Sequence, residues 1–191
     1  AVNTLKELDL KINAVLPSHG PVLDKDPQEA IELYDRWSRE YDRPEGQKKV
    51  FIPYVSSYGY TAQLAKAVAD ELDSLGIETD LADIAGLSSE EVADRIYCAD
   101  ALALGSPTIN ADALPPIWLA LSHLSAPLVR GRKAVVFGSY GWSGEGVPFA
   151  EQRLSGLGFK VVGTLRVRFR PDCQALGDAR ALAKTLADAM K

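Results

Sequence analysis

The stretch that decides the fold is Val50-Phe-Ile-Pro-Tyr-Val-Ser-Ser-Tyr-Gly-Tyr-Thr-Ala-Gln-Leu-Ala-Lys-Ala-Val68. Its first part, 50–55, is a short apolar run of the kind that a parallel sheet buries on both faces. A polar turn at 56–61 follows, and Leu64, Val68 and Leu72 then recur at helical spacing. The stretch therefore predicts a buried strand, a tight turn and a helix.

The turn at 56–61 opens the predicted helix, and the first N–H groups of a helix have no partners within it. With the positive end of the helix dipole and several hydroxyl groups, they suit a phosphate monoester. The turn lacks the lysine and the spacing of a Walker P-loop, and GxGxxG is absent too. An ordinary serine-rich turn is the alternative. The pattern S/T-x-x-G-x-T resembles the FMN phosphate loop of flavodoxins, which implies binding by Ser56, Ser57, Tyr58, Gly59, Tyr60 and Thr61.

The composition is that of a globular protein. Of the 191 residues, 47% are hydrophobic and 25% are charged. No apolar run approaches the ~20 residues of a membrane-spanning helix. The first residues lack the basic region and apolar core of a signal peptide, and two cysteines give no disulfide framework, so we expect a cytoplasmic protein. The absence of a basic stripe argues against a nucleic-acid partner.

From Lys49 onward, strand and helix patterns alternate. After the first strand, further strands are predicted at 77–84, 101–105, 134–138 and 159–170. Five helices accompany these five strands. Right-handed crossovers then predict an α/β fold with a doubly wound parallel sheet, strand order 2-1-3-4-5, and a ligand at the carboxyl ends of strands 1 and 3. One face of the last strand is expected to carry Val161, Gly163, Leu165, Val167 and Phe169.

Residues 1–45 do not match the start of this sheet. A short strand is expected at 12–16, and Asp26 precedes Pro27 in the pattern of a helix N-terminus. The polar segment 40–49 is broken by proline and glycine and has the composition of a linker. We therefore predict two domains, 1–45 and 46–191, the first forming a strand and helix appendage to the sheet domain.

The loops after strands 1, 3 and 4 emerge at one edge of such a sheet. Aromatic side chains in the third loop offer flat apolar surface, and glycines there allow the backbone to come close to a ring. The chemistry suits a flavin, and we predict FMN rather than FAD because no second nucleotide site is evident. Acidic residues in these loops, Asp112 and Glu145, are candidate proton relays. The second and third loops contribute Pro107, Thr108, Ile109, Asn110, Ser139, Tyr140, Gly141, Trp142, Ser143 and Gly144 to the predicted site.

Two of these loops carry a closer resemblance. Ser-Pro-Thr-Ile-Asn at 106–110 and Gly-Ser-Tyr-Gly-Trp-Ser-Gly at 138–144 resemble the second and third FMN loops of flavodiiron proteins, also called type A flavoproteins. The resemblance covers residues 46–191. It identifies them with the C-terminal flavodoxin-like domain of that family.

The N-terminal segment adds to the resemblance. Pro-Ser-His-Gly at 17–20, followed by a helix, is similar to the end of the metallo-β-lactamase-like domain that precedes the flavodoxin domain in this family. His19 would correspond to the last ligand of its diiron site. The other ligands, including a His-x-Glu-x-Asp-His motif, are not in the chain, and a diiron site needs several N and O ligands. We therefore expect a metal-free turn here and a diiron centre only in a longer parent protein.

The resemblance implies a parent oxidoreductase that reduces oxygen to water, or nitric oxide to nitrous oxide, at a diiron centre. FMN would take electrons from a reductase, a rubredoxin-like protein or NAD(P)H and pass them to the diiron domain of the same or the opposite subunit of a homodimer. This chain alone would bind FMN without reducing oxygen at iron.

Two alternatives remain open, a flavodoxin-like NAD(P)H:quinone reductase and a free flavodoxin carrier. Residues 46–191 carry 15 basic and 16 acidic residues, a near-neutral balance that disfavours a diffusing acidic carrier. Along the last strand, Arg166, Arg168 and Arg170 alternate with apolar residues. A solvated face is expected for them, with contact to a partner domain or subunit as the alternative.

Overall fold

The computed structural model describes residues 10–18, 20–40 and 46–191. The chain divides into two compact units, Ala1–Gly46 and Gln47–Lys191. In the smaller unit, the expected strand at 12–16 is reduced to a single antiparallel bridge between Val15 and Leu23, which precedes α2 (Pro27–Glu40). Asp26 caps this helix, because its Oδ1 accepts the N–H of Glu29 at 2.9 Å.

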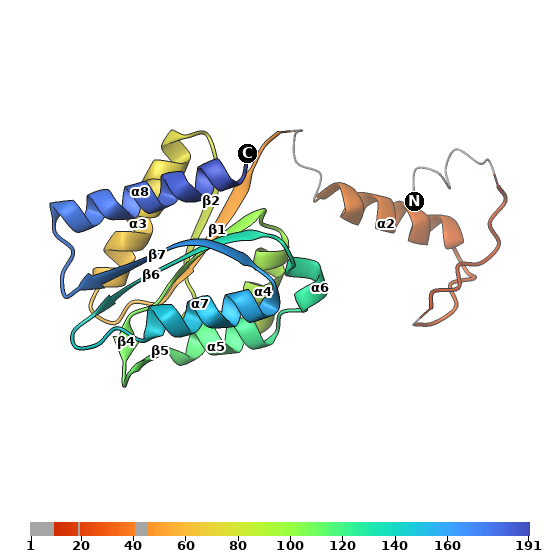
Figure 1. The fold of residues 1–191 in the computed structure, drawn as a ribbon. Coiled ribbons are helices and arrows are strands. Elements are labelled where there is room, and N and C mark those ends of the chain that lie inside the picture. The colour runs from red at the N-terminus through yellow and green to blue at the C-terminus, as the bar shows by residue number, and fades with distance from the viewer. Residues whose placement is uncertain (1–9, 19, 41–45) are drawn as a thin grey trace. The chain divides into compact units, whose positions relative to one another are not determined.

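The larger unit is built around a five-stranded parallel sheet of order β2-β1-β3-β6-β7, which confirms the predicted doubly wound topology (Figure 1). The strands are β1 (Lys49–Tyr54), β2 (Glu78–Asp83), β3 (Ala101–Gly105), β6 (Lys133–Tyr140) and β7 (Lys160–Arg168). On one face lie α3 (Tyr60–Ser74) and α8 (Cys173–Ala189). The other face is covered by α4 (Ser89–Tyr97), α5 (Pro115–Ser122) and α7 (Gly146–Leu157).

One helix of this unit is missing from the sequence prediction. The short α6 (Ala126–Val129) follows α5, so the unit has six helices rather than five. Its four residues are too few to show a helical period, and a proline lies in its first turn.

The central strands are buried on both faces. In β1, Phe51 packs into the core under α4, α5 and α7, whereas Val50 and Ile52 pack into the core under α3 and α8. All five residues of β3 are buried as well. Two apolar layers explain why these strands read as continuous apolar runs and not as alternating ones.

A β-bulge in β7 corrects the prediction that its apolar residues share one face. Val161 lies opposite Ala134, but Gly163 lies opposite Val135, so β7 has one extra residue at this point. Val161 therefore packs with the α4, α5 and α7 core, whereas Leu165 packs with the other core. A bulge breaks the period of two on which the prediction rested.

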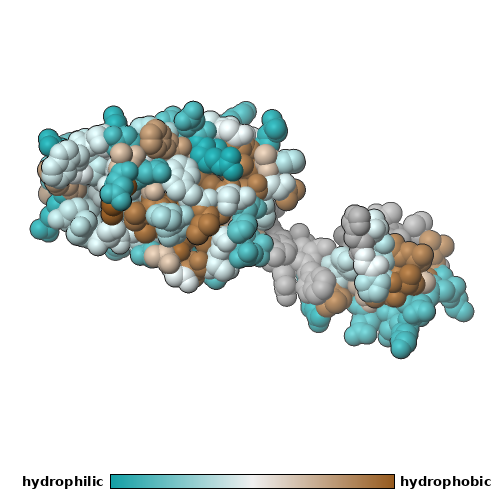
Figure 2. Space-filling model, turned by 90° about the horizontal axis from the view of Figure 1, so that it is seen from below, coloured by the Kyte–Doolittle hydropathy of each residue, from teal (hydrophilic) through white to brown (hydrophobic). Residues whose placement is uncertain are grey.

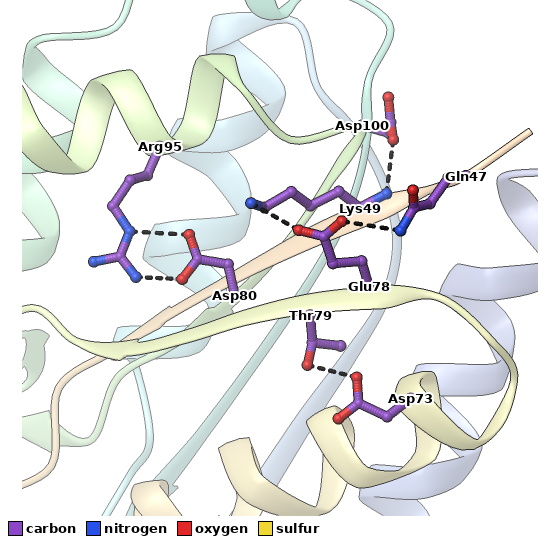
Figure 3. A network of polar contacts seen from close by, with 8 residues as sticks. All are labelled: Gln47, Lys49, Asp73, Glu78, Thr79, Asp80, Arg95 and Asp100. Carbon is purple, nitrogen blue, oxygen red and sulfur yellow. Dashed lines mark hydrogen bonds and ion pairs between the residues drawn. The ribbon is translucent and has the colours of Figure 1, made fainter. Parts of the chain in front are cut away.

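Polar contacts fasten the outer strand β2 (Figure 3). Arg95 forms a two-pronged ion pair with Asp80, and its guanidinium lies 4.7 Å from the centre of the Phe51 ring. At the start of the sheet, Lys49 Nζ lies 3.0 Å from Glu78 Oε1. β2 lies at the edge of the sheet and is only half-buried, so these contacts form where one side of the strand faces solvent.

The surface of the larger unit mixes polar and apolar groups. In the view of Figure 2, hydrophobic patches on this unit are separated by hydrophilic side chains. No helix in the described residues is long and apolar enough to span a membrane.

Replacing Gly138 by alanine should destabilise the larger unit. A Cβ at this position in β6 would lie 1.9 Å from the backbone oxygen of Ser106, which cannot move away as a side chain could. We expect a loss of about 3 kcal/mol in the free energy of unfolding, measured by urea denaturation. In the control variant Gly177→Ala, the new methyl group enters open space on α8 and should stabilise the protein by roughly 0.5–1 kcal/mol. Equal stabilities of the two variants would contradict this packing.

Candidate functional site at the carboxyl edge of the sheet

The strands that carry the three predicted loops end side by side. Tyr54 of β1 pairs with Gly105 of β3, which in turn pairs with Phe137 of β6. Because parallel strands all point the same way, the loops that follow them emerge at one edge of the sheet. This edge, next to the point where the strand order reverses, is where open α/β sheets bind ligands.

The first loop leads into α3 without a side chain at the cap position. Gly59 is the N-cap, with a φ of 76° that residues with a side chain rarely adopt. Ser56 Oγ accepts the N–H of Ala62 at 3.2 Å. The N–H groups of Tyr60 and Thr61 precede the first backbone hydrogen bond of the helix, so they have no carbonyl partner within it. They lie at its positive end. Loop and helix thus present backbone donors that suit an anion.

A buried hydrogen bond ties the first loop to the third. Thr61 Oγ1 and Ser139 Oγ lie 2.9 Å apart, and the two residues are only 1% and 7% exposed. The bond joins positions 78 apart in the sequence. The structure thus brings the predicted site residues Thr61 and Ser139 together between the first and third loops. Direct contact of either residue with a phosphate stays a prediction.

The second loop is a β-hairpin, which the sequence prediction described only as a loop. Strands β4 (Thr108–Ile109) and β5 (Asp112–Ala113) pair antiparallel. The two residues between them, Asn110 and Ala111, have φ values of 53° and 60°. Positive φ at both positions defines a type I′ turn, and the usual signal for it, a glycine at the second position, is absent here.

Hydroxyl groups also hold the second loop in place. Ser106 Oγ accepts the N–H of Leu114 at 3.1 Å and so closes the base of the hairpin. Thr108 Oγ1 accepts the N–H of Gly146 at 3.1 Å, which joins the hairpin to the start of α7. Side-chain hydroxyls therefore join the first loop to the third, and the second loop to the start of α7 that follows the third.

Large aromatic side chains project from two of the loops. Tyr58 in the first loop is 80% exposed, and Trp142 in the third is 92% exposed. In the third loop, Gly144 has a φ of 79°, and a Cβ there would lie 3.0 Å from the Tyr140 ring. An exposed aromatic side chain gains no free energy from burial. A surface that carries such side chains is therefore often one that a ligand or partner covers.

The structure adds a residue that the sequence did not indicate. Phe169 follows β7, and its N–H donates to Tyr140 O at 2.7 Å, so it borders the third loop. Its φ is 62°, a conformation that costs a residue with a side chain roughly 1–2 kcal/mol. Arg168 Nε donates to Gly141 O at 3.3 Å, and its guanidinium lies 5.3 Å from the Phe169 ring centre. No sequence pattern predicts a phenylalanine with a positive φ at this position.

Glu145 lies between the third loop and α7. The Ser143 hydroxyl, the backbone N–H of Glu145 itself and the nearby Arg166 lower the pKa of this carboxyl group. Its Oε2 is buried and has no hydrogen-bond partner among the described residues. Glu145 is therefore negatively charged at neutral pH. The proton relay predicted for Glu145 and Asp112 remains a prediction.

The predicted metal ligand His19 lies outside the described residues. Within residues 10–18, 20–40 and 46–191, no three His, Cys, Asp or Glu side chains gather in a group that could hold a metal ion.

The donors at this edge fit a phosphate monoester linked to a flat ring system. The first loop contributes neutral hydroxyl and backbone N–H groups and contains no cation. The exposed rings and glycines of the loops suit an aromatic heterocycle. Comparison with protein families agrees with this chemistry, since the flavodoxin family model matches residues 52–182. The chain belongs to the flavodoxin family. This membership confirms the prediction of FMN as the cofactor.

The chain is also similar to type A flavoproteins over nearly its whole length. It is 39% identical to the type A flavoprotein fprA of Rhodobacter capsulatus over 192 residues, which cover 98% of this chain and 44% of that protein. It is 31% identical to a nitric oxide reductase of Moorella thermoacetica, over 84% of this chain and 39% of that protein.

A solved structure extends this similarity to the fold. Rubredoxin oxygen:oxidoreductase from Desulfovibrio gigas is 25% identical, with a TM-score of 0.75, over 99% of this chain and 47% of that one. The flavodoxin-like chain thus spans less than half the length of these relatives, and the predicted resemblance to flavodiiron proteins is confirmed.

Removing the hydroxyls that tie the first and third loops should lower stability in a coupled way. We expect Thr61→Val and Ser139→Ala each to cost about 1–2 kcal/mol, since each leaves a buried hydroxyl without its partner. In urea denaturation the double variant should cost less than the sum of the two, by at least about 0.5 kcal/mol.

The matched control for this cycle is Thr185→Val, which removes an exposed hydroxyl that bonds only to the backbone of its own helix, at Ala181. Its effect should stay within about 0.5 kcal/mol. Strict additivity of Thr61→Val and Ser139→Ala would show that the two hydroxyls do not depend on each other.

Proposed function

We propose that residues 47–191 form the FMN-binding electron-transfer domain of a flavodiiron oxidoreductase. One observation carries the proposal. The loops after β1, β3 and β6 meet at the carboxyl edge of the sheet and are tied together by Thr61, Ser139 and Thr108. A site assembled from three separate loops is held in one shape by these bonds, and a preformed site binds with less loss of conformational entropy.

Each loop has a distinct role in this proposal. The loop at 56–61 and the start of α3 hold the phosphate with backbone N–H and hydroxyl groups. The segments 107–110 and 139–144 flank the ring, and Tyr58 and Trp142 cover its faces. When bound, FMN supplies the ability to take up and release electrons. The protein residues orient it, exclude water from its faces and set the charge around it.

Adding FMN to the purified chain should produce a yellow protein that quenches flavin fluorescence. Replacing Trp142 by alanine should raise the dissociation constant about tenfold, because the largest exposed ring of the loops is lost. The control is Leu119→Ala, which removes an apolar side chain that is also exposed, on α5 away from the three loops, and should leave binding unchanged. A chain that stays colourless with excess FMN would refute the proposal.

The parent protein is proposed as an enzyme of two domains. The relatives that support this are a nitric oxide reductase and a rubredoxin oxygen:oxidoreductase. In the proposal, residues 1–45 end a metallo-β-lactamase-like domain, and His19 ligates iron only when the rest of that domain is present. A reductase, a rubredoxin-like protein or NAD(P)H delivers electrons. They pass to a diiron centre of the same or the opposite subunit in a cytoplasmic homodimer, where oxygen or nitric oxide is reduced.

Iron content and gas consumption test the division of labour between the two domains. With FMN bound and a reductant present, this chain should contain no stoichiometric iron and should not consume oxygen or nitric oxide with iron-dependent turnover, because a diiron site needs several ligands from one domain. Stoichiometric iron together with fast turnover in this chain would contradict the proposed division.

A further inference from the structure

Three arginines line the exposed end of the outer strand β7. Arg166 and Arg168 are the exposed neighbours of the buried Val167, and Arg170 follows shortly after the strand. β7 is the last strand of the sheet. None of the three forms an ion pair with another described residue at 4.0 Å or less, although the carboxylate of Glu145 is close enough to Arg166 to feel its charge.

These arginines border the third loop of the site. In the sheet register, Arg166 lies opposite Gly138 and Arg168 opposite Tyr140. The guanidinium of Arg168 also donates to the backbone of Gly141. Two positive side chains therefore lie beside the loop proposed to flank the flavin ring, in a chain whose net charge is −5.

Two exposed aromatics complete this surface. Trp142 is 92% exposed and Phe169 is 53% exposed. Phe169 adopts a left-handed backbone conformation, which is strained for a residue with a side chain. Strain of this kind often marks a functional site. Tryptophan and arginine are the residues that most often dominate binding energy at protein interfaces, and aromatic rings are enriched there. The side chains of Trp142 and Phe169 are part neither of the buried core nor of the polar contacts around β2.

We propose that Arg166, Arg168, Arg170, Phe169 and Trp142 form the docking surface for an acidic electron-donor protein. The inference rests on the proposed function, because it places the donor beside the bound flavin. Charge complementarity selects the partner, since unpaired arginines attract carboxylates and speed the encounter of oppositely charged proteins. A donor seated here loses one electron for each electron that the flavin gains, and water supplies any protons that the reduced flavin takes up.

The test uses the FMN-loaded chain and a reduced [2Fe–2S] ferredoxin, an acidic one-electron carrier, as the probe. Flavin reduction is followed by anaerobic stopped-flow absorbance at low and high ionic strength. The variant Arg166→Gln/Arg170→Gln removes two charges and spares Arg168, whose guanidinium supports the third loop. The matched control, Lys160→Gln/Arg180→Gln, removes two exposed charges from the start of β7 and from α8.

We expect the wild-type rate constant to fall as salt is added. The Arg166→Gln/Arg170→Gln variant should lose at least about threefold of the low-salt rate and most of the salt dependence, whereas the control should stay within about twofold of wild type. Photochemical reduction of the flavin should be equal in all three proteins. Failure of FMN binding or of photoreduction would instead count against the proposed function.

A second variant separates docking from folding. Phe169→Gly removes the ring but suits the left-handed backbone, so it should slow reduction by ferredoxin without lowering the melting temperature. Equal ferredoxin rates in all variants, or a salt-independent wild-type rate, would overturn the proposal. So would an arginine variant that loses only its reduction by NADPH, or one that alters only the oligomeric state of the chain.

Discussion

The hydrogen bond between Thr61 and Ser139 is the constraint on which the site depends. It is buried and crosses from the start of α3 to the end of β6, so it fixes the distance between two loops that share no covalent link nearby. A hydroxyl pair in an apolar surrounding is costly to break, because each group would remain without a partner. Together with the Thr108 contact to Gly146, it joins the three loops through hydrogen bonds at one edge of the sheet.

The charges around this edge bear on the reduction potential of a bound flavin. The first loop has no cation, so a phosphate held there keeps its negative charge. Glu145 adds a second negative charge at the third loop. Negative charge near a flavin opposes the addition of electrons and lowers its reduction potential, a property that the protein and not the cofactor controls. Arg166 and Arg168 of β7 border the third loop, so their positive charges offset part of this effect.

Much of this fold could be predicted from local sequence patterns. The apolar run at 50–55 predicted a strand buried on both faces. Ser88-Ser-Glu-Glu91 has the sequence of a capping box, and at the start of α4 Ser88 Oγ accepts the N–H of Glu91 at 3.1 Å. The loops of the site could be predicted too, because topology alone brings the ends of neighbouring parallel strands to one edge.

What the sequence could not show depends on contacts between distant segments. The bulge at Val162 inserts one residue into a regular alternation, and its position is set by packing between β6 and β7. The I′ turn at 110–111 lacks its usual glycine, and the left-handed Phe169 is held by a bond to Tyr140. The partner of Thr61 could not be inferred either, because nothing local distinguishes a hydroxyl that binds a ligand from one that ties two loops.

The most direct measurement is the change in backbone amide NMR shifts of the isotopically labelled chain as FMN is added. If the three loops form one site, amides in 56–61, 107–110 and 139–144 should shift together at a single flavin equivalent, while the amides of α8 stay in place. Shifts confined to one loop, or centred on the face formed by α3 and α8, would contradict a flavin site at the carboxyl edge of the sheet.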